Sequence, residues 1–385
     1  MRRTVFNEDH EVFRQTIREF IASEVVPYYH EWEQQGFVPR DFYKKLGEMG
    51  VFGIEVPEEY GGAGQHDFKF IAVITEECAR AGVSFGGSSV HTGLCLPYLL
   101  AYATEEQKRR WLPPFVSGDM MTAIAMTEPG TGSDLAGMKT TARLSEDGTH
   151  YILNGAKTFI TGGVQADRVL VCCRTAPPTL EDRRGGISIL VVDTKSEGYV
   201  VGRTLDKLGL KTSDTAELSF TDVKVPVEDL LGEEGKGFEY LSHNLPQERL
   251  GIAVGAYAQA AAAVRFAQEY VQDRTVFGKS VASFQNTKFV LADCRSDVDA
   301  MQAVVDRALE AHDAGELSGA DAASVKLFTT ETAAKVIDKC LQLHGGYGYM
   351  REYPIARLYA DTRVTRIYGG TSEVMRSIIA KSMGL

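Results

Sequence analysis

The sequence lacks a surplus of positive charge. Its 385 residues include 52 acidic and 41 basic side chains, which gives a formal net charge of -11. Proteins that bind nucleic acid neutralise phosphates with lysine and arginine, so this charge balance argues against such a function. Apolar runs of the roughly 20 residues needed to cross a bilayer are also lacking, and we expect no membrane span.

The N-terminus lacks the apolar core of a signal peptide. Residues Met1–Phe6 are followed at once by Asn7, Glu8 and Asp9, and then by an amphipathic helical pattern. Because this pattern begins so early, there is no room for a transit peptide. We therefore expect a cytoplasmic protein.

Paired cysteines and clustered histidines are absent too. The six cysteines form no Cys-x-x-Cys pair, and the eight histidines show no His-Glu-x-x-His spacing. Cys172 and Cys173 fall in a predicted strand, where adjacent side chains point to opposite faces. We expect reduced core cysteines and no metal site. The cysteines are Cys78, Cys95, Cys172, Cys173, Cys294 and Cys340.

The sequence changes character twice along its length. Residues 1–121 show helical patterns, 122–232 show short β-rich runs separated by turns, and 233–385 return to long amphipathic helices. We therefore predict an α+β multidomain protein with an N-terminal α-helical domain, a middle β-barrel or sandwich-like domain and a C-terminal four-helix bundle. The predicted bundle helices are Gln247–Asp273, Gln285–Ala314, Gly319–Leu343 and Thr371–Lys381.

The helix predicted at Gln247–Asp273 has the most distinctive sequence. Pro246 precedes it, at a position where helices tolerate proline, and the small residues of Ala253–Ala263 favour close packing. Glu248 would then lie in the first turn. A carboxylate there either caps free N–H groups or serves as a base. The residues alone leave both roles open, and capping is the more common of the two.

Several loops carry turn formers beside polar or aromatic residues. In the run Met126–Asp134, Gly130 and Gly132 could bring backbone N–H groups to an anion, but Leu135 stands where a dinucleotide fingerprint requires glycine. Four further runs of this kind occur, and each taken alone is best interpreted as a strand end, a helix end or a helix cap. These runs are Phe159–Gly163, Arg274–Lys279, Gln342–Gly348 and Ile367–Glu373.

In their order and spacing, these runs resemble the acyl-CoA dehydrogenase family from about Val5 to Met383. The most specific matches are Thr127–Asp134, Arg274–Lys279, Gln342–Gly348 and Tyr368–Ser372. The resemblance implies FAD as cofactor, dehydrogenation of a fatty (long-chain or branched) acyl-CoA to trans-2-enoyl-CoA, and electron-transferring flavoprotein as acceptor. An acyl-CoA oxidase of the same fold and a non-catalytic acyl-CoA-binding protein are the alternatives.

The resemblance also implies how FAD is held. Residues of one subunit expected at the cofactor are Met126, Thr127, Gly132, Ser133, Phe159, Ile160, Thr161, Thr371 and Glu373. Residues expected to reach the cofactor of a neighbouring subunit are Arg274, Phe277, Gln285, Gln342, Leu343, His344, Gly345 and Gly346. Because two subunits share each cofactor in this family, we expect a homotetramer. Substrate contacts are expected from Ser133, Arg249, Gly369 and Gly370.

One departure from the family pattern bears on the catalytic base. Most members carry an acid in Tyr-Glu-Gly-Thr, where this chain has Tyr368-Gly369-Gly370-Thr371. The long-chain and isovaleryl branches instead place the base on the long helix in Glu-Arg-Leu, which Glu248-Arg249-Leu250 matches. The resemblance thus implies that Glu248 is the base. Burial would raise the pKa of this carboxylate and strengthen it as a base, while Gly369 and Gly370 could offer N–H groups to the thioester oxygen.

Overall fold

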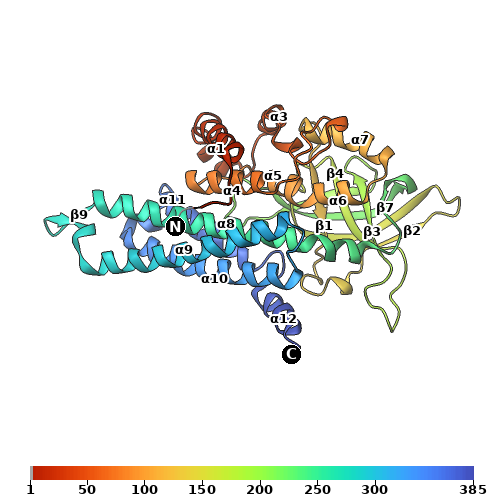
Figure 1. The fold of residues 1–385 in the computed structure, drawn as a ribbon. Helices are drawn as coiled ribbons and strands as arrows, with labels where there is room; N and C mark the ends of the chain where they lie inside the picture. Colours follow the sequence, from red (N-terminus) through yellow and green to blue (C-terminus); the bar gives the residue numbers. More distant parts are fainter. Residues whose placement is uncertain (1–2) are drawn as a thin grey trace.

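The computed structural model describes residues 3–385, and it places a β sheet at one end of the molecule, next to an N-terminal helical layer that lies along a long helical bundle (Figure 1). The last N-terminal helix begins with a capping box. Gln107 N donates to Thr104 Oγ1 at 3.2 Å and Thr104 N donates to Gln107 Oε1 at 2.9 Å. The helices of this region are α1 (Glu8–Phe20), α2 (Tyr29–Gln35), α3 (Arg40–Glu48), α4 (Lys69–Ala81), α5 (Ser88–Val90), α6 (Leu96–Tyr102) and α7 (Glu105–Val116).

The middle region forms one eight-stranded sheet. Its strands are β1 (Thr122–Ala125), β2 (Thr141–Leu144), β3 (His150–Thr161), β4 (Arg168–Arg174), β5 (Ile187–Asp193), β6 (Tyr199–Thr204), β7 (Thr215–Pro226) and β8 (Leu230–Leu231). They run in the order β6-β7-β3-β2-β4-β5-β8, and β1 pairs in parallel with β4. Strand β3 is continuous, although register shifts against β7 near Gly155 and Phe159 interrupt the alternation of its side chains. Strand β6 lies at the edge of the sheet, and its residues after Tyr199 are all exposed, the apolar Val200 and Val201 included.

The C-terminal region is a bundle of long helices. Its elements are α8 (Gly237–Asp273), α9 (Gln285–Asp313), α10 (Gly319–Leu343), α11 (Pro354–Thr362) and α12 (Ser372–Ser382), with a hairpin of β9 (Thr275–Val276) and β10 (Lys279–Ser280) at the far end (Figure 1). Helix α8 packs against α9 and α10 and also against α4 of the N-terminal layer. Its alanine-rich stretch is buried, as the sequence predicted.

Helix α8 begins ten residues before its predicted start. It runs for 37 residues and holds Pro246 in its interior. The interpretation of Glu248 as a first-turn cap is therefore wrong, because Glu248 lies three turns inside the helix. Proline at such a position lacks an N–H and crowds the preceding turn. Tyr240 and Leu241, before the proline, are buried in the core shared with the N-terminal layer, and this packing holds the helix together across it.

Helix α8 is also long and apolar enough to cross a membrane, judged by length and composition. Its most apolar 18-residue window has a mean hydropathy of 1.3, which corrects the expectation that no run of this length exists. However, 56% of that window is buried inside the protein, against α4, α9 and α10. We interpret α8 as the core helix of the bundle.

All six cysteines are free and buried, as the sequence predicted. Cys172 and Cys173 lie on opposite faces of β4. Cys172 belongs to the apolar core shared with the N-terminal helices, whereas Cys173 belongs to the core on the other side of the sheet.

Candidate active site

The loop after β1 is held by a buried ion pair. Lys157 of β3 donates from Nζ to the Glu128 carboxylate and to the Met126 carbonyl, each at 3.0 Å. Glu128 also accepts from the amides of Lys139 and Thr140, at 2.6 and 2.9 Å. These bonds lower the pKa of Glu128 despite its desolvation and keep it anionic. The turn carrying Gly132 and Ser133 is therefore fixed at its base and exposed at its tip.

Phe159 presents an aromatic ring beside this loop. Its backbone has a φ of 61°, an uncommon conformation for a non-glycine residue, and its side chain is 68% exposed. Thr158 N donates to Thr127 O at 3.0 Å, which ties the strand to the loop. Ile160 points the other way and is buried in the core of the sheet, so only its backbone faces the loop side. Thr161 ends β3 and is half-buried.

Glu248 lies directly opposite the glycine turn that follows α11. A Cβ added to Gly369 would stand 3.3 Å from Glu248 Oε1 and 3.6 Å from Lys326 Cε. Gly369 and Gly370 both have positive φ, at 62° and 92°, as a turn this tight requires. Among residues 3–385, neither glycine amide donates to a protein acceptor. A carboxylate and two free N–H groups therefore meet at one place.

Two cations flank this carboxylate. Arg249 Nε donates to Gly369 O at 3.3 Å, and Lys326 Nζ donates to Tyr368 O at 2.6 Å and to Gly370 O. Desolvation raises the pKa of Glu248, while both cations oppose the shift. Burial lowers the pKa of Lys326 to about 8, opposed by the negative charge of Glu248. The site thus holds a carboxylate of increased basicity next to a lysine that is easily deprotonated.

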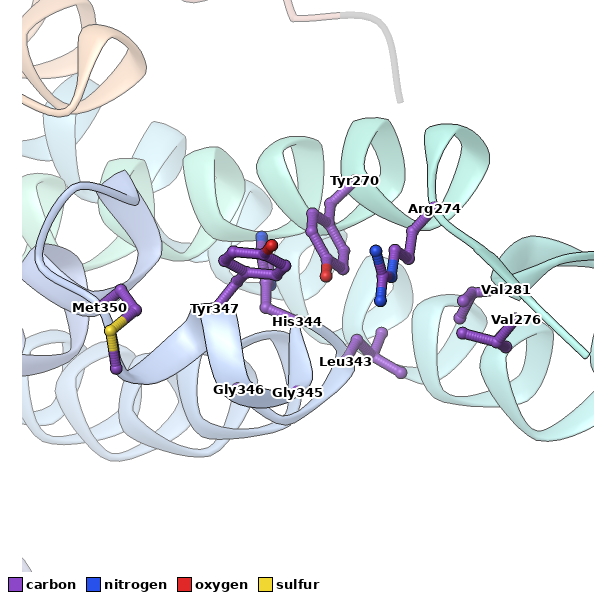
Figure 2. A pocket seen from close by; sticks show the side chains of 10 residues that line it. All are labelled: Tyr270, Arg274, Val276, Val281, Leu343, His344, Gly345, Gly346, Tyr347 and Met350. Carbon is purple, nitrogen blue, oxygen red and sulfur yellow. The ribbon is translucent and has the colours of Figure 1, made fainter.

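A cavity of about 530 Å³ opens at the opposite end of the bundle (Figure 2). Arg274 lies beside the rings of Tyr270 and Tyr347 there, with its guanidinium carbon 5.8 Å from the Tyr347 ring centre. Of the residues predicted at a neighbour's cofactor, the cavity brings together Arg274, Leu343, His344, Gly345 and Gly346. Phe277, Gln285 and Gln342 do not line it and are exposed nearby, Phe277 to 94%.

The two groups of predicted cofactor residues lie far apart in one chain. The hairpin β9–β10, which follows Arg274, is at one end of the molecule, and the sheet that carries Phe159 is at the other (Figure 1). Thr371 and Glu373 lie in a third segment, which follows the glycine turn. They begin α12, where Thr371 accepts from Val374 N at 3.3 Å and Glu373 is exposed.

Sequence reasoning missed Lys326. This lysine is 1% exposed and occupies the buried stripe of α10 between Ala322 and Thr330, one turn from each. A lysine within an otherwise small and apolar stripe was a usable signal. Its partners, in the turn 368–370, are more than forty residues away and could not be read from the pattern.

The residues present fit a flavin dinucleotide. Phe159 has an uncommon backbone φ, and its exposed aromatic ring offers a flat surface to the flavin ring system. The cavity at the other end combines Arg274, aromatic rings and the backbone of two glycines, and such a lining suits a nucleotide. The fold and these two regions place the protein among flavin-dependent oxidoreductases. More particularly, the chain belongs to the acyl-CoA dehydrogenase family. Models of its N-terminal, middle and C-terminal domains match residues 7–119, 123–223 and 235–384.

Known proteins support the same assignment. The long-chain specific acyl-CoA dehydrogenase of Sus scrofa is 42% identical over 381 residues, covering 99% of this chain and 88% of the relative. An acyl-CoA dehydrogenase structure from Geobacillus kaustophilus shares 46% identity with a TM-score of 0.95, covering 99% of both chains. A Bacillus anthracis acyl-CoA dehydrogenase in complex with FAD shares 33% identity with a TM-score of 0.88, covering 98% of this chain and 68% of that one. FAD is the cofactor of this family.

Proposed function

We propose that this protein oxidises long-chain or branched fatty acyl-CoA thioesters to trans-2-enoyl-CoA, with Glu248 as the base. The observation that carries the proposal is the place of Glu248, facing a turn of two glycines whose amides have no acceptor in the described part of the chain, residues 3–385. Position 369, which faces Glu248, is a glycine and therefore has no side chain that could act as the base. A base and an oxyanion site therefore come from different elements, α8 and the turn before α12.

The chemistry needs one proton and one hydride to leave the substrate. Glu248 takes the α-proton, and the electron pair of that C–H bond moves toward the thioester oxygen. Gly369 and Gly370 offer this oxygen two N–H donors as its charge grows. FAD, when bound, accepts the hydride from the β-carbon. Desolvation raises the pKa of Glu248, and this makes its carboxylate a stronger base for a proton that is only weakly acidic.

The fatty acyl preference rests on the site and on similarity. Ile252, one turn beyond Glu248 along α8, fills the space at position 369 and forms an apolar wall beside the base. The relative at 42% identity is named for long chains. We extend that preference to this chain and propose electron-transferring flavoprotein as the acceptor of the electrons.

Assembly is part of the proposal. The hairpin β9–β10, which follows Arg274, and the sheet that carries Phe159 lie at opposite ends of the molecule, and we propose that they serve different bound cofactors (Figure 1). A second copy would bring the two groups together, as in a homotetramer with closed symmetry.

The test measures reduction of the flavin in a single anaerobic turnover with straight, branched and aromatic acyl-CoAs. The loss of the flavin's yellow colour reports the reduction. Glu248→Gln keeps the shape of the side chain but cannot take a proton, so we expect flavin reduction to slow by about 10²–10⁴-fold or more. FAD content and acyl-CoA binding should persist. The matched control is Glu269→Gln, an exposed acid on the same helix, which should reduce its flavin at the parent rate.

Three results would reject parts of this proposal. Reduction of Glu248→Gln at the parent rate would place the base elsewhere. Consumption of one oxygen per turnover in air, without any need for electron-transferring flavoprotein, would instead identify an acyl-CoA oxidase. A purified protein whose flavin no acyl-CoA bleaches would be a binding protein rather than an enzyme.

A further inference from the structure

Three successive carbonyls of the glycine turn accept hydrogen bonds from buried cations. Lys326 binds the first and third, at Tyr368 and Gly370, and Arg249 binds the second, at Gly369. The two cations come from different helices, α10 and α8, and they are 1% and 6% exposed. The turn is therefore held from both sides by positive charge.

Burying a lysine in this way is costly when its partners are neutral carbonyls. No carboxylate within residues 3–385 forms an ion pair with Lys326, although Glu248 is close enough for its charge to be felt. A neutral donor could hold the same carbonyls at lower cost. The presence of a cation therefore points to a role for its charge.

A cation bound at a carbonyl oxygen makes the N–H of the same peptide group a stronger hydrogen-bond donor. The Tyr368 carbonyl shares its peptide group with the Gly369 N–H, and the Gly369 carbonyl shares its group with the Gly370 N–H. A hydrogen bond accepted at the oxygen polarises the group, so its N–H becomes a stronger donor. These two N–H groups are the ones without a protein acceptor among the described residues.

The same cations also suit the movement of charge during the reaction. Before proton transfer the negative charge is on Glu248, and after it the charge is on the thioester oxygen. Both cations favour the ionised form of Glu248, and they bond to the carbonyls of the peptide groups whose N–H donors would meet the thioester oxygen, so they stabilise the charge at the start and at the end. Fixed dipoles and charges of this kind require no rearrangement as the reaction proceeds.

We propose that Lys326 and Arg249 are positioning residues that fix the Tyr368–Gly370 turn and polarise its two free amides toward the thioester oxygen. The inference rests on the proposed function, in which Glu248 removes the α-proton and that oxygen takes up the charge. Neither cation exchanges a proton with the substrate. Their effect is on how readily the α-proton leaves.

The test isolates that proton from the later hydride transfer. In a 3-thia-acyl-CoA, sulfur replaces the β-carbon, so the bound analogue can lose its α-proton but cannot give up a hydride. Its anion beside oxidised flavin produces a long-wavelength charge-transfer band. Titrating the band against pH in the FAD-loaded enzyme measures the apparent pKa of the bound analogue, separately from its affinity.

In Lys326→Met we expect the analogue to bind but to be about 10–100-fold harder to deprotonate, the effect of losing hydrogen bonds from a charged donor. Lys335→Met, at an exposed lysine of the same helix, should match the parent. Arg249→Lys keeps the charge but loses the Nε donor, and we expect a smaller change in the same direction. Melting temperatures of all variants separate this effect from loss of folding.

Two failures are distinguishable. If the parent enzyme gives no charge-transfer band, or if Glu248→Gln gives the full band, the proposed function fails. If the parent gives the band and Lys326→Met and Arg249→Lys both deprotonate the analogue as the parent does, the proposed role of the cations is wrong and they only support the fold. Should Lys326→Met not fold, the result for Arg249→Lys decides alone.

Discussion

At position 369 the chain can accommodate no side chain. A Cβ there would lie 2.4 Å from Ile252 Cδ1, and the backbone φ of 62° is unfavourable for residues other than glycine. An acid placed at this position would have to displace Ile252 before it could reach the substrate. The space that the family's other branches fill with a carboxylate is here closed by α8.

We therefore expect Gly369→Ala to lower the melting temperature for two reasons, the strain of a left-handed backbone and the clash of the new Cβ with Ile252. The left-handed backbone costs roughly 1–2 kcal/mol for any L-residue. Gly50→Ala is the matched control, because Gly50 has a φ of 76° and open space around its Cβ position. Calorimetric scans of the FAD-loaded proteins give both values. Equal losses in the two variants would show that Ile252 yields without cost.

The charges around Glu248 predict a bell-shaped pH profile for kcat/KM. Activity should rise with pH through the raised pKa of Glu248, since the base must be unprotonated. It should fall again above about pH 8, where Lys326 loses its proton and the turn loses a cation. Steady-state rates at saturating acceptor, measured from acidic to alkaline pH, test both limbs.

Lys326→Met tests whether the alkaline limb of the pH profile belongs to Lys326. The alkaline limb should disappear, and the acidic limb should move to higher pH because a cation that favours ionised Glu248 is gone. Lys335→Met should keep the parent profile. An unchanged alkaline limb in Lys326→Met would assign that limb to another group.

On the scale of elements, Pro246 separates two parts of α8. The turns before it pack against the N-terminal layer, and the turns after it carry Glu248 and the bundle core. Proline in a helix interior removes one backbone hydrogen bond and costs about 3 kcal/mol relative to alanine. A residue this costly, placed two positions before the base, sets the path of the helix into the site.

Pro246→Ala should therefore raise the melting temperature and lower kcat. Restoring the backbone hydrogen bond favours a regular helix, which shifts Glu248 relative to the glycine turn, the usual exchange of activity for stability. Calorimetry and single-turnover flavin reduction measure the two effects. A variant that is more stable and fully active would show that the proline has no part in placing Glu248.

Regular elements with clear ends were predictable from the sequence. Helix α10 was predicted with its observed bounds, because Ser318 caps its start and a glycine run follows Leu343. The start of α8 was not, because its turns before Pro246 are held by tertiary packing that the local pattern does not contain. Strand β6 was harder to predict, because its adjacent Val200 and Val201 are both exposed and show no alternation between a buried and an exposed face.

The same division applies to the site. Glu248 and the two glycines were found through short motifs, and the structure places them face to face. Their cations were not found as a set, since Lys326 and the turn it binds meet only when α10 packs against the segment before α12. Residues recognised by motif were accessible to sequence reasoning, whereas residues defined by a long-range hydrogen bond were not.

On the scale of the whole molecule, the features suited to one cofactor occupy opposite ends of the chain. The sheet with Phe159 lies at one end and the cavity with Arg274 at the other (Figure 1, Figure 2). Aromatic side chains at the cavity end, Phe277 and Tyr349, are 94% and 87% exposed. Exposed aromatic rings at a cofactor cavity are suited to contact with a second copy.

If two copies of the chain share each active site, two inactive variants should restore activity when they assemble together. Glu248→Gln removes the base from one half of the site, and Arg274→Ala removes the cation from the other half, so each variant alone should be inactive. When both chains are co-expressed, a mixed assembly contains a site with native Glu248 from one copy and native Arg274 from its neighbour. Up to about a quarter of the sites should then regain activity, if copies pair at random within a symmetric assembly.

The control pairs two changes in the same half of the site. Glu248→Gln co-expressed with Gly369→Ala yields no site in which both residues are native, so no activity should return. Flavin reduction per chain by acyl-CoA, measured after the mixed assembly is purified by a tag on each chain, gives the recovered fraction. If Glu248→Gln and Arg274→Ala chains also fail to complement, each copy builds its site alone, and the cavity beside Arg274 serves some other ligand.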